Sequence, residues 1–179
     1  MDNTHQNASP TADREMVVTR LIDVPAALVF NAWIEPSQLA RWWGPNGFKT
    51  TVHEMDVAEG GITRLAMHGP DGVDYPNKLT YTDILAAKRL CYMQTDDSDL
   101  DNDAAVVGVS VLFEEEGPQT RVTMHTLFKT AAERDRVVKE YDALGGANQT
   151  LERLDAFLKE FLPPREGATA SPDAKRPAS

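Results

Sequence analysis

Four side chains that can exchange a proton or orient a ligand stand in segments that alternate apolar and polar residues: His53, Tyr81, Tyr92 and His125. Inside an apolar pocket, an imidazole or a phenol can orient a carbonyl or hydroxyl, or act as a general acid or base. Alternation puts His53 on the same side of its strand as Met55, so we expect it to face inward. His125 alternates with its apolar neighbours and is expected to face outward. The alternative for all four is that they point to solvent or satisfy one another in the core.

The histidines do not form a metal-binding pattern. The four of them are scattered without ligand spacing, and His53-Glu54 has Val57 where a zinc-protease helix motif needs its second histidine. Asp99, Asp101 and Asp103 resemble the start of a calcium loop, but the loop's obligatory glycine is missing. We expect no metal site and no cofactor, and a solvated acidic loop between two strands.

Nucleophilic catalysis has no motif either. Residues 108–112 lack the closing glycine of a hydrolase elbow, and Cys91 has no basic neighbour beyond Arg89. Because Cys91 is also the only cysteine, a disulfide within the chain is excluded. We expect this thiol to be buried and structural.

The composition indicates one acidic globular domain. The chain has 179 residues, 41% of them hydrophobic, and a formal charge of -10. Such a charge repels phosphate backbones and anionic lipids, so we expect neither nucleic acid nor membrane as a partner. The longest nearly apolar run, residues 104–113, is too short to span a bilayer. With no signal-peptide pattern at the start, a cytoplasmic location is expected.

The elements that must position these side chains follow from residue patterns. Residues 16–23 predict a strand, and prolines at 25 and 36 predict the starts of two short helices. Alternation predicts further strands over residues 51–57, 63–67, 79–85, 89–94, 106–114 and 121–128. The predicted fold is α+β, with a curved antiparallel sheet of about six to seven strands around a long C-terminal helix.

The last helix has the clearest pattern. Thr130 and Glu133 match a capping box, and seven apolar residues then recur at spacings of three, four and seven. Gly145-Gly146 interrupts this stripe and is expected to bend the helix. The domain is predicted to span residues 15–162. Residues 1–14 and 163–179 carry no apolar stripe and are predicted to be disordered tails.

The order of elements and several local motifs resemble the SRPBCC superfamily of START-type helix-grip proteins. Within it, the chain is most similar to the family of the C-terminal domain of the activator of heat-shock-protein-ninety ATPase. The motifs that carry the resemblance are Val24-Pro25, Val29-Phe30, Trp33, residues 39–45, residues 56–61, residues 88–90, Gly146, Leu151, Arg153, Leu154 and Leu158. The resemblance implies a cavity between the sheet and the last helix.

The resemblance implies less about function, because its members include lipid carriers, polyketide cyclases and co-chaperones. We predict a module that binds a small apolar or amphipathic molecule, favour this function over an enzyme, and leave a homodimer open. The expected cavity residues are His53, Met55, Leu65, Met67, Tyr81, Tyr92, Leu144, Ala147 and Leu151, with Trp42 and Trp43 at the rim.

Two rival functions stay open. The first is a cyclase or hydro-lyase that uses His53 and a tyrosine as acid and base in the same cavity. The second is a co-chaperone of a heat-shock ATPase, which the shortness of residues 1–15 disfavours because the eukaryotic co-chaperones carry an additional N-terminal domain. Many relatives place a tryptophan where this chain has Ala147. If that position faces the sheet, the smaller side chain leaves room in the cavity.

Overall fold

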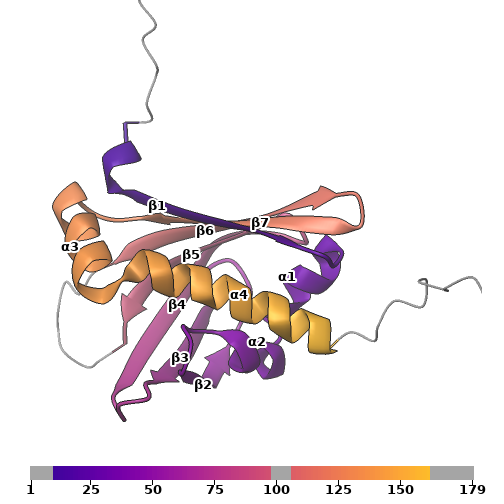
Figure 1. The fold of residues 1–179 in the computed structure, drawn as a ribbon, viewed down its shortest axis with the longest axis horizontal. Coiled ribbons are helices and arrows are strands. Elements are labelled where there is room, and N and C mark those ends of the chain that lie inside the picture. The colour runs from indigo at the N-terminus through magenta and orange to yellow at the C-terminus, as the bar shows by residue number, and fades with distance from the viewer. Residues whose placement is uncertain (1–9, 98–105, 162–179) are drawn as a thin grey trace, which may run out of the picture.

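The computed structural model describes residues 10–97 and 106–161, and of Phe161 only the backbone (Figure 1). Its elements in chain order are a 3-10 turn η1 (Ala12–Arg14), β1 (Glu15–Ile22), α1 (Ala26–Ile34), α2 (Pro36–Trp42), β2 (Lys49–Met55), β3 (Ile62–His68), β4 (Asp74–Leu85), β5 (Arg89–Asp96), β6 (Val107–Glu116), β7 (Gln119–Leu127), α3 (Ala131–Tyr141) and α4 (Ala143–Phe161). The α+β class predicted from the sequence is confirmed.

Seven strands form one antiparallel sheet in the order β1-β7-β6-β5-β4-β3-β2. The first strand therefore pairs with the last one, and β2 to β7 follow each other as hairpins. Alternation is cleanest on β7, where Thr120, Val122, Met124 and Thr126 are buried and the residues between them are half-buried. Each strand thus presents one face to the core, as a period of two requires.

Helix α4 crosses the inner face of this sheet, with α1 and α2 beside its C-terminal half and α3 at its N-terminal end (Figure 1). Leu151, Leu154, Phe157 and Leu158 are buried along one side of α4 at helical spacing. The sheet grips the helix, which confirms the predicted helix-grip fold. Among the described residues, no helix combines the length and the apolar composition that a membrane crossing needs.

The long C-terminal helix is divided in two, and the break lies before the glycines. Asp142 adopts a left-handed conformation with φ of 47° and separates α3 from α4. Its carboxylate accepts the backbone N–H of Gly145 at 3.3 Å, so one short polar side chain both ends α3 and starts α4. At the other end of α3, the hydroxyl of Thr130 accepts the N–H of Glu133 at 3.1 Å, as the capping box predicts.

The described structure begins before the predicted domain boundary. The guanidinium of Arg14 donates to the carbonyl of Phe128 at 2.8 Å, and the N–H of Phe128 donates to the carbonyl of Arg14 at 2.9 Å. Residues 12–14 are therefore tied to the chain that follows β7. The rest of the predicted N-terminal tail, residues 1–9, the predicted tail 163–179 and the acidic loop within residues 98–105 lie outside the described residues.

Candidate functional site

A cavity of about 370 Å³ lies between the inner face of the sheet and the N-terminal half of α4. It is lined by Met16, Trp43, Gly44, Pro45, Met67, Tyr92, Gln94, Val107, Val109, Met124, Thr126, Phe128, Val137, Ala143, Gly146, Ala147 and Thr150. This lining of described residues contains no acidic, basic or histidine side chain, and most of it is apolar. A cavity of this kind suits an uncharged molecule with a largely apolar surface.

The sheet side of the cavity is one row of laterally paired residues. Tyr92 on β5 pairs with Val109 on β6, Val109 pairs with Thr126 on β7, and Thr126 pairs with Met16 on β1. Residues paired in this way in an antiparallel sheet point to the same face. All four residues line the cavity, so the sheet register itself places two hydroxyl groups among apolar side chains.

The helix side of the cavity consists of small residues. Ala143, Gly146, Ala147 and Thr150 stand at three- and four-residue spacing in α4 and line the cavity together. A methyl group added at Gly146 would meet only the Cβ of Pro45, at 3.9 Å. Because these side chains are short, α4 can cross the sheet here without filling the space beneath it.

Arg153 holds the chain segment that closes one side of the cavity. Its guanidinium donates to the carbonyls of Trp43, Gly44 and Pro45 at 3.2, 2.8 and 3.0 Å, and to the carbonyl of Phe48 at 3.1 Å. Partial burial lowers the pKa of Arg153 through desolvation, although an arginine stays charged under all ordinary conditions. This planar donor fixes the loop between α2 and β2 against α4.

Two tyrosines stand side by side on the inner face. Tyr81 and Tyr92 pair across β4 and β5, with ring centroids 6.3 Å apart in an edge-to-face arrangement. The Tyr81 hydroxyl shares a hydrogen bond of 2.7 Å with Thr63. Burial raises the pKa of both phenols, and that of Tyr92 most, so both remain protonated in the biological pH range.

Aromatic side chains surround the outer opening of the cavity. Two further hollows, of about 370 and 520 Å³, share Met67 with the cavity and extend past Phe48, Tyr75 and Tyr141. The rings of Phe48 and Tyr75 lie 5.8 Å apart, and Tyr141 is 70% exposed. We call these three aromatic residues the mouth.

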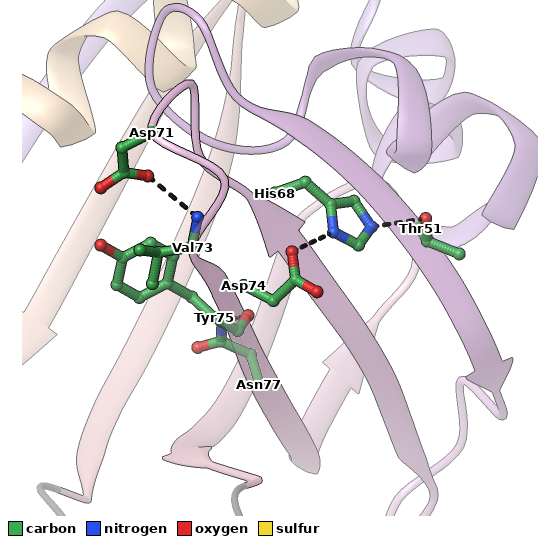
Figure 2. A network of polar contacts seen from close by, with 7 residues as sticks. All are labelled: Thr51, His68, Asp71, Val73, Asp74, Tyr75 and Asn77. Carbon is green, nitrogen blue, oxygen red and sulfur yellow. Dashed lines mark hydrogen bonds and ion pairs between the residues drawn. The ribbon is translucent and has the colours of Figure 1, made fainter.

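Hydrogen bonds hold the β3–β4 hairpin, which carries Tyr75 of the mouth (Figure 2). The carboxylate of Asp71 accepts the N–H of Val73 at 3.1 Å and shapes the turn. The amide of Asn77 donates to the carbonyl of Tyr75 at 3.0 Å, and the amide of Gln94 donates to Asn77 at 2.9 Å. The turn at residues 69–72 therefore presents Tyr75 at the mouth.

A hydroxyl, an imidazole and a carboxylate lie in sequence on the opposite, outer face of the sheet (Figure 2). The Oγ1 of Thr51 is 2.9 Å from Nε2 of His68, and Nδ1 of His68 is 2.7 Å from a carboxylate oxygen of Asp74. The order resembles a catalytic triad. All three side chains are at least one-third exposed, and neither Thr51 nor His68 lines the cavity, so we assign the three to strand pairing across β2, β3 and β4.

The structure brings four of the residues predicted from the sequence to the cavity: Trp43, Met67, Tyr92 and Ala147. It packs four others into the core without contact to the cavity: Trp42, Leu65, Tyr81 and Leu151, each at most 2% exposed. Met55 packs against the core, and Leu144 is 41% exposed on the far side of α4. Four of the predicted residues thus line the cavity, and the others lie in the core or on the surface.

The expected inward orientation of His53 is wrong. Strand β2 contains a bulge between Val52 and Glu54, which pair with Leu65 and Arg64 respectively. His53 is the extra residue of this bulge and is exposed, whereas Val52 and Met55 both face the core. One inserted residue shifts the alternation by one position, which removes the histidine from the inner face. His125 faces outward, as predicted, within 3.1 Å of Glu15.

The sequence did not predict several lining residues, because they come from strands at the far side of the sheet. Alternation on β7 does indicate Met124 and Thr126, and alternation on β6 indicates Val107 and Val109. The contribution of Met16 depends on β1 pairing with β7, which is a contact between the two ends of the domain. Among the described residues, no group of three or more acidic, histidine or cysteine side chains is placed to hold a metal ion.

The fold and the cavity define a helix-grip protein. Residues 23–159 match the family model of Activator of Hsp90 ATPase homolog 1-like proteins, and the chain belongs to this family. The resemblance found in the sequence is confirmed. No protein of curated function matches the sequence.

Solved structures show the same fold at low sequence identity. A protein from Arthrobacter aurescens superposes with a TM-score of 0.76 at 24% identity, over 92% of this chain and 95% of that one. Protein Ms6760 from Mycobacterium smegmatis gives 0.73 at 24% identity, over 83% and 92%. The AHSA1 protein from Silicibacter pomeroyi gives 0.67 at 18% identity, over 83% and 99%. At such identities the similarity extends to the fold alone.

Proposed function

We propose that this protein binds a small apolar or amphipathic molecule in the cavity between the sheet and α4. The observation that carries the proposal is the cavity itself, a partly open hollow of about 370 Å³ lined by apolar strand residues and small helix residues. Binding sites of this size with apolar linings and a few hydroxyl groups are typical of small-molecule carriers.

Acid–base catalysis is less well supported by the described lining. His53, the base in the enzyme alternative, is exposed on the outside of β2. The lining offers Tyr92 in its place, but burial raises the pKa of this phenol and makes it a poor base. The described lining therefore supports ligand binding more than it supports acid–base catalysis.

The expected affinity follows from the apolar area. A ligand that hides about 250 Å² of apolar surface gains roughly 6 kcal/mol before the costs of association. At 100 times its dissociation constant, such a ligand stabilises the folded state by about 2.7 kcal/mol. For a chain of this size, that is a rise in melting temperature of roughly 5–10 °C.

Native mass spectrometry of the purified protein, followed by thermal-shift measurements, tests the proposal. We expect a bound metabolite that is apolar or amphipathic, and a rise in melting temperature when that metabolite is added back. Ala147→Trp is the matched control, because an indole at this lining position occupies the cavity. The same metabolite bound equally by wild type and Ala147→Trp would place the binding site elsewhere.

A panel of fatty acids, sterols, flavonoids and polyketides extends the test to ligands that are lost during purification. No mass adduct and no thermal shift with any of them would remove the proposal. The family's name refers to activation of the Hsp90 ATPase, and a pull-down against that chaperone tests the co-chaperone alternative. Retention of the chaperone by Ala147→Trp as well as wild type would indicate a surface contact that is independent of the cavity.

A further inference from the structure

Two buried residues that line the cavity carry a hydroxyl group with no hydrogen-bond partner among the described residues. Tyr92 and Thr126 both line the cavity and are 2% and 7% exposed. No hydrogen bond joins either hydroxyl to another described residue, whereas Tyr81 bonds to Thr63. Among the described side chains, the buried polar atoms without a partner are Trp33 Nε1 and Asp155 Oδ1, so the Tyr92 and Thr126 hydroxyls keep access to the space of the cavity. A molecule in the cavity can therefore pair with them, as polar groups inside proteins nearly always are paired.

The sheet register fixes the backbone spacing of these two residues. Tyr92 and Thr126 flank Val109 in the same lateral row, on β5 and β7. Two strand spacings place their Cα atoms about 10 Å apart. The apolar side chain of Val109 lies between them. A ligand that contacts both hydroxyls therefore spans Val109.

Charge disfavours anionic ligands at this position. The described lining of the cavity has no cationic side chain that could pair with a carboxylate. Asp74, Asp96 and Asp142 line the two outer hollows, with Arg136 as their cation, and the chain carries a formal charge of -10. An anion would lose its hydration in the cavity and gain no opposite charge, which is strongly unfavourable.

We propose that the cavity selects uncharged ketones or esters with an apolar body, whose carbonyl oxygen accepts a hydrogen bond from the Tyr92 hydroxyl, with Thr126 as a second contact. This inference rests on the proposed function and names the class of ligand. Burial raises the pKa of the Tyr92 phenol, which keeps it protonated and therefore a donor throughout the biological pH range. Thr126, which is shorter, donates to an oxygen that lies closer to the sheet.

Calorimetric titration with three matched probes tests the inference. The probes are 1-acetylnaphthalene, a ketone; 1-ethylnaphthalene, which lacks the oxygen; and 1-naphthoate, which is anionic. We expect wild type to bind the ketone about five- to tenfold more tightly than the hydrocarbon, as one neutral hydrogen bond predicts. Naphthoate is expected to bind more weakly than either. Tyr92→Phe should remove the preference for the ketone and leave the affinity for the hydrocarbon unchanged.

The controls separate this inference from the proposed function. Thr126→Val should reduce the ketone preference less than Tyr92→Phe does, and the melting temperature of each variant reports whether it is folded. Equal affinity of wild type for ketone and hydrocarbon would overturn the inference and leave the proposed function standing. A preference for the ketone that survives in Tyr92→Phe, or tighter binding of naphthoate, would also overturn it. If none of the probes binds, the inference falls, and native mass spectrometry decides separately on the proposed function.

Discussion

The two halves of α4 cover the same sheet face, yet one half builds a core and the other a cavity. At the closed end, the second half of α4 lies beside α1 and α2, where the aromatic rings of Phe30, Trp33, Trp42 and Phe113 pack edge to face with centroids 4.7 to 6.2 Å apart. At the open end, the first half of α4 presents Ala143, Gly146, Ala147 and Thr150 to the cavity. The backbone architecture is shared, so side-chain size alone decides where the interior is filled.

Trp43 stands at the boundary between these two ends. Its ring lies 5.7 Å from the rings of both Trp33 and Trp42, and it also lines the cavity. A binding site that borders a rigid aromatic cluster is held in place by that cluster, because close-packed cores deform little. The closed end therefore stabilises the fold and holds the cavity wall in place, and the open end contains the cavity.

The largest expected effect comes from the same substitution made at each end. Ala32 is fully buried against the aromatic rings of the closed end, whereas Ala147 lines the cavity. Ala32→Trp forces neighbouring rings off their rotamers and should cost more than about 3 kcal/mol, whereas Ala147→Trp should cost under about 1 kcal/mol. Melting temperatures of both variants measure the difference. A similar loss at both positions would mean that the open end is packed as tightly as the closed end.

A second large effect concerns the loop that joins the ends. Arg153→Met removes four hydrogen bonds to backbone carbonyls and should cost about 3 kcal/mol, measured by urea unfolding. Arg153→Lys keeps the charge but loses the planar fork, so we expect an intermediate loss. Full stability in Arg153→Met would show that the cavity wall at Gly44 and Pro45 is held by other contacts.

The sequence alone predicts the framework well and the cavity only in part. Alternation on the strands and the stripe on α4 are local signals, and they place Leu151, Leu154 and Tyr92 on the inner face. No local sequence pattern indicates the bulge at His53. One inserted residue changes the strand pairing but does not change which kinds of residue the strand contains. The contacts of Arg153 cross more than 100 residues of sequence, and no local pattern reports them.

A third effect compares two valines on one strand. Val111 of β6 is fully buried in the core, whereas Val109, two residues earlier, lines the cavity. Val111→Ala removes two methyl groups from close packing and should cost about 2 kcal/mol, including the void that is left. Val109→Ala should cost about half as much, because its side chain already faces space on one side. Urea unfolding measures both, and a greater loss for Val109→Ala would contradict the assignment of the open end.

The smallest effect concerns the two neighbouring glycines at the start of α4. Gly146→Ala adds a methyl group that meets only Pro45, at 3.9 Å, and reduces the freedom of the unfolded chain, so it should raise stability by about 0.5 kcal/mol. Gly145→Ala places its methyl group against the carboxylate of Asp142, which accepts the Gly145 N–H and caps the helix. Displacing that cap should cost about 1.5 kcal/mol, against the same gain of about 0.5 kcal/mol from the less flexible unfolded chain, for a net loss of about 1 kcal/mol.

The expected changes in stability have opposite signs at these adjacent positions. This difference distinguishes an unfilled cavity beside Gly146 from a helix that accepts alanine at either position. If the open end were filled, the methyl group at Gly146 would meet more than one neighbour and the gain would vanish. If helix propensity alone governed both sites, Gly145→Ala and Gly146→Ala would stabilise the protein equally. Melting temperatures should rise by roughly 1–2 °C for Gly146→Ala and fall by roughly 2–4 °C for Gly145→Ala. A rise in both would show that Asp142 does not need its contact with Gly145 to separate α3 from α4.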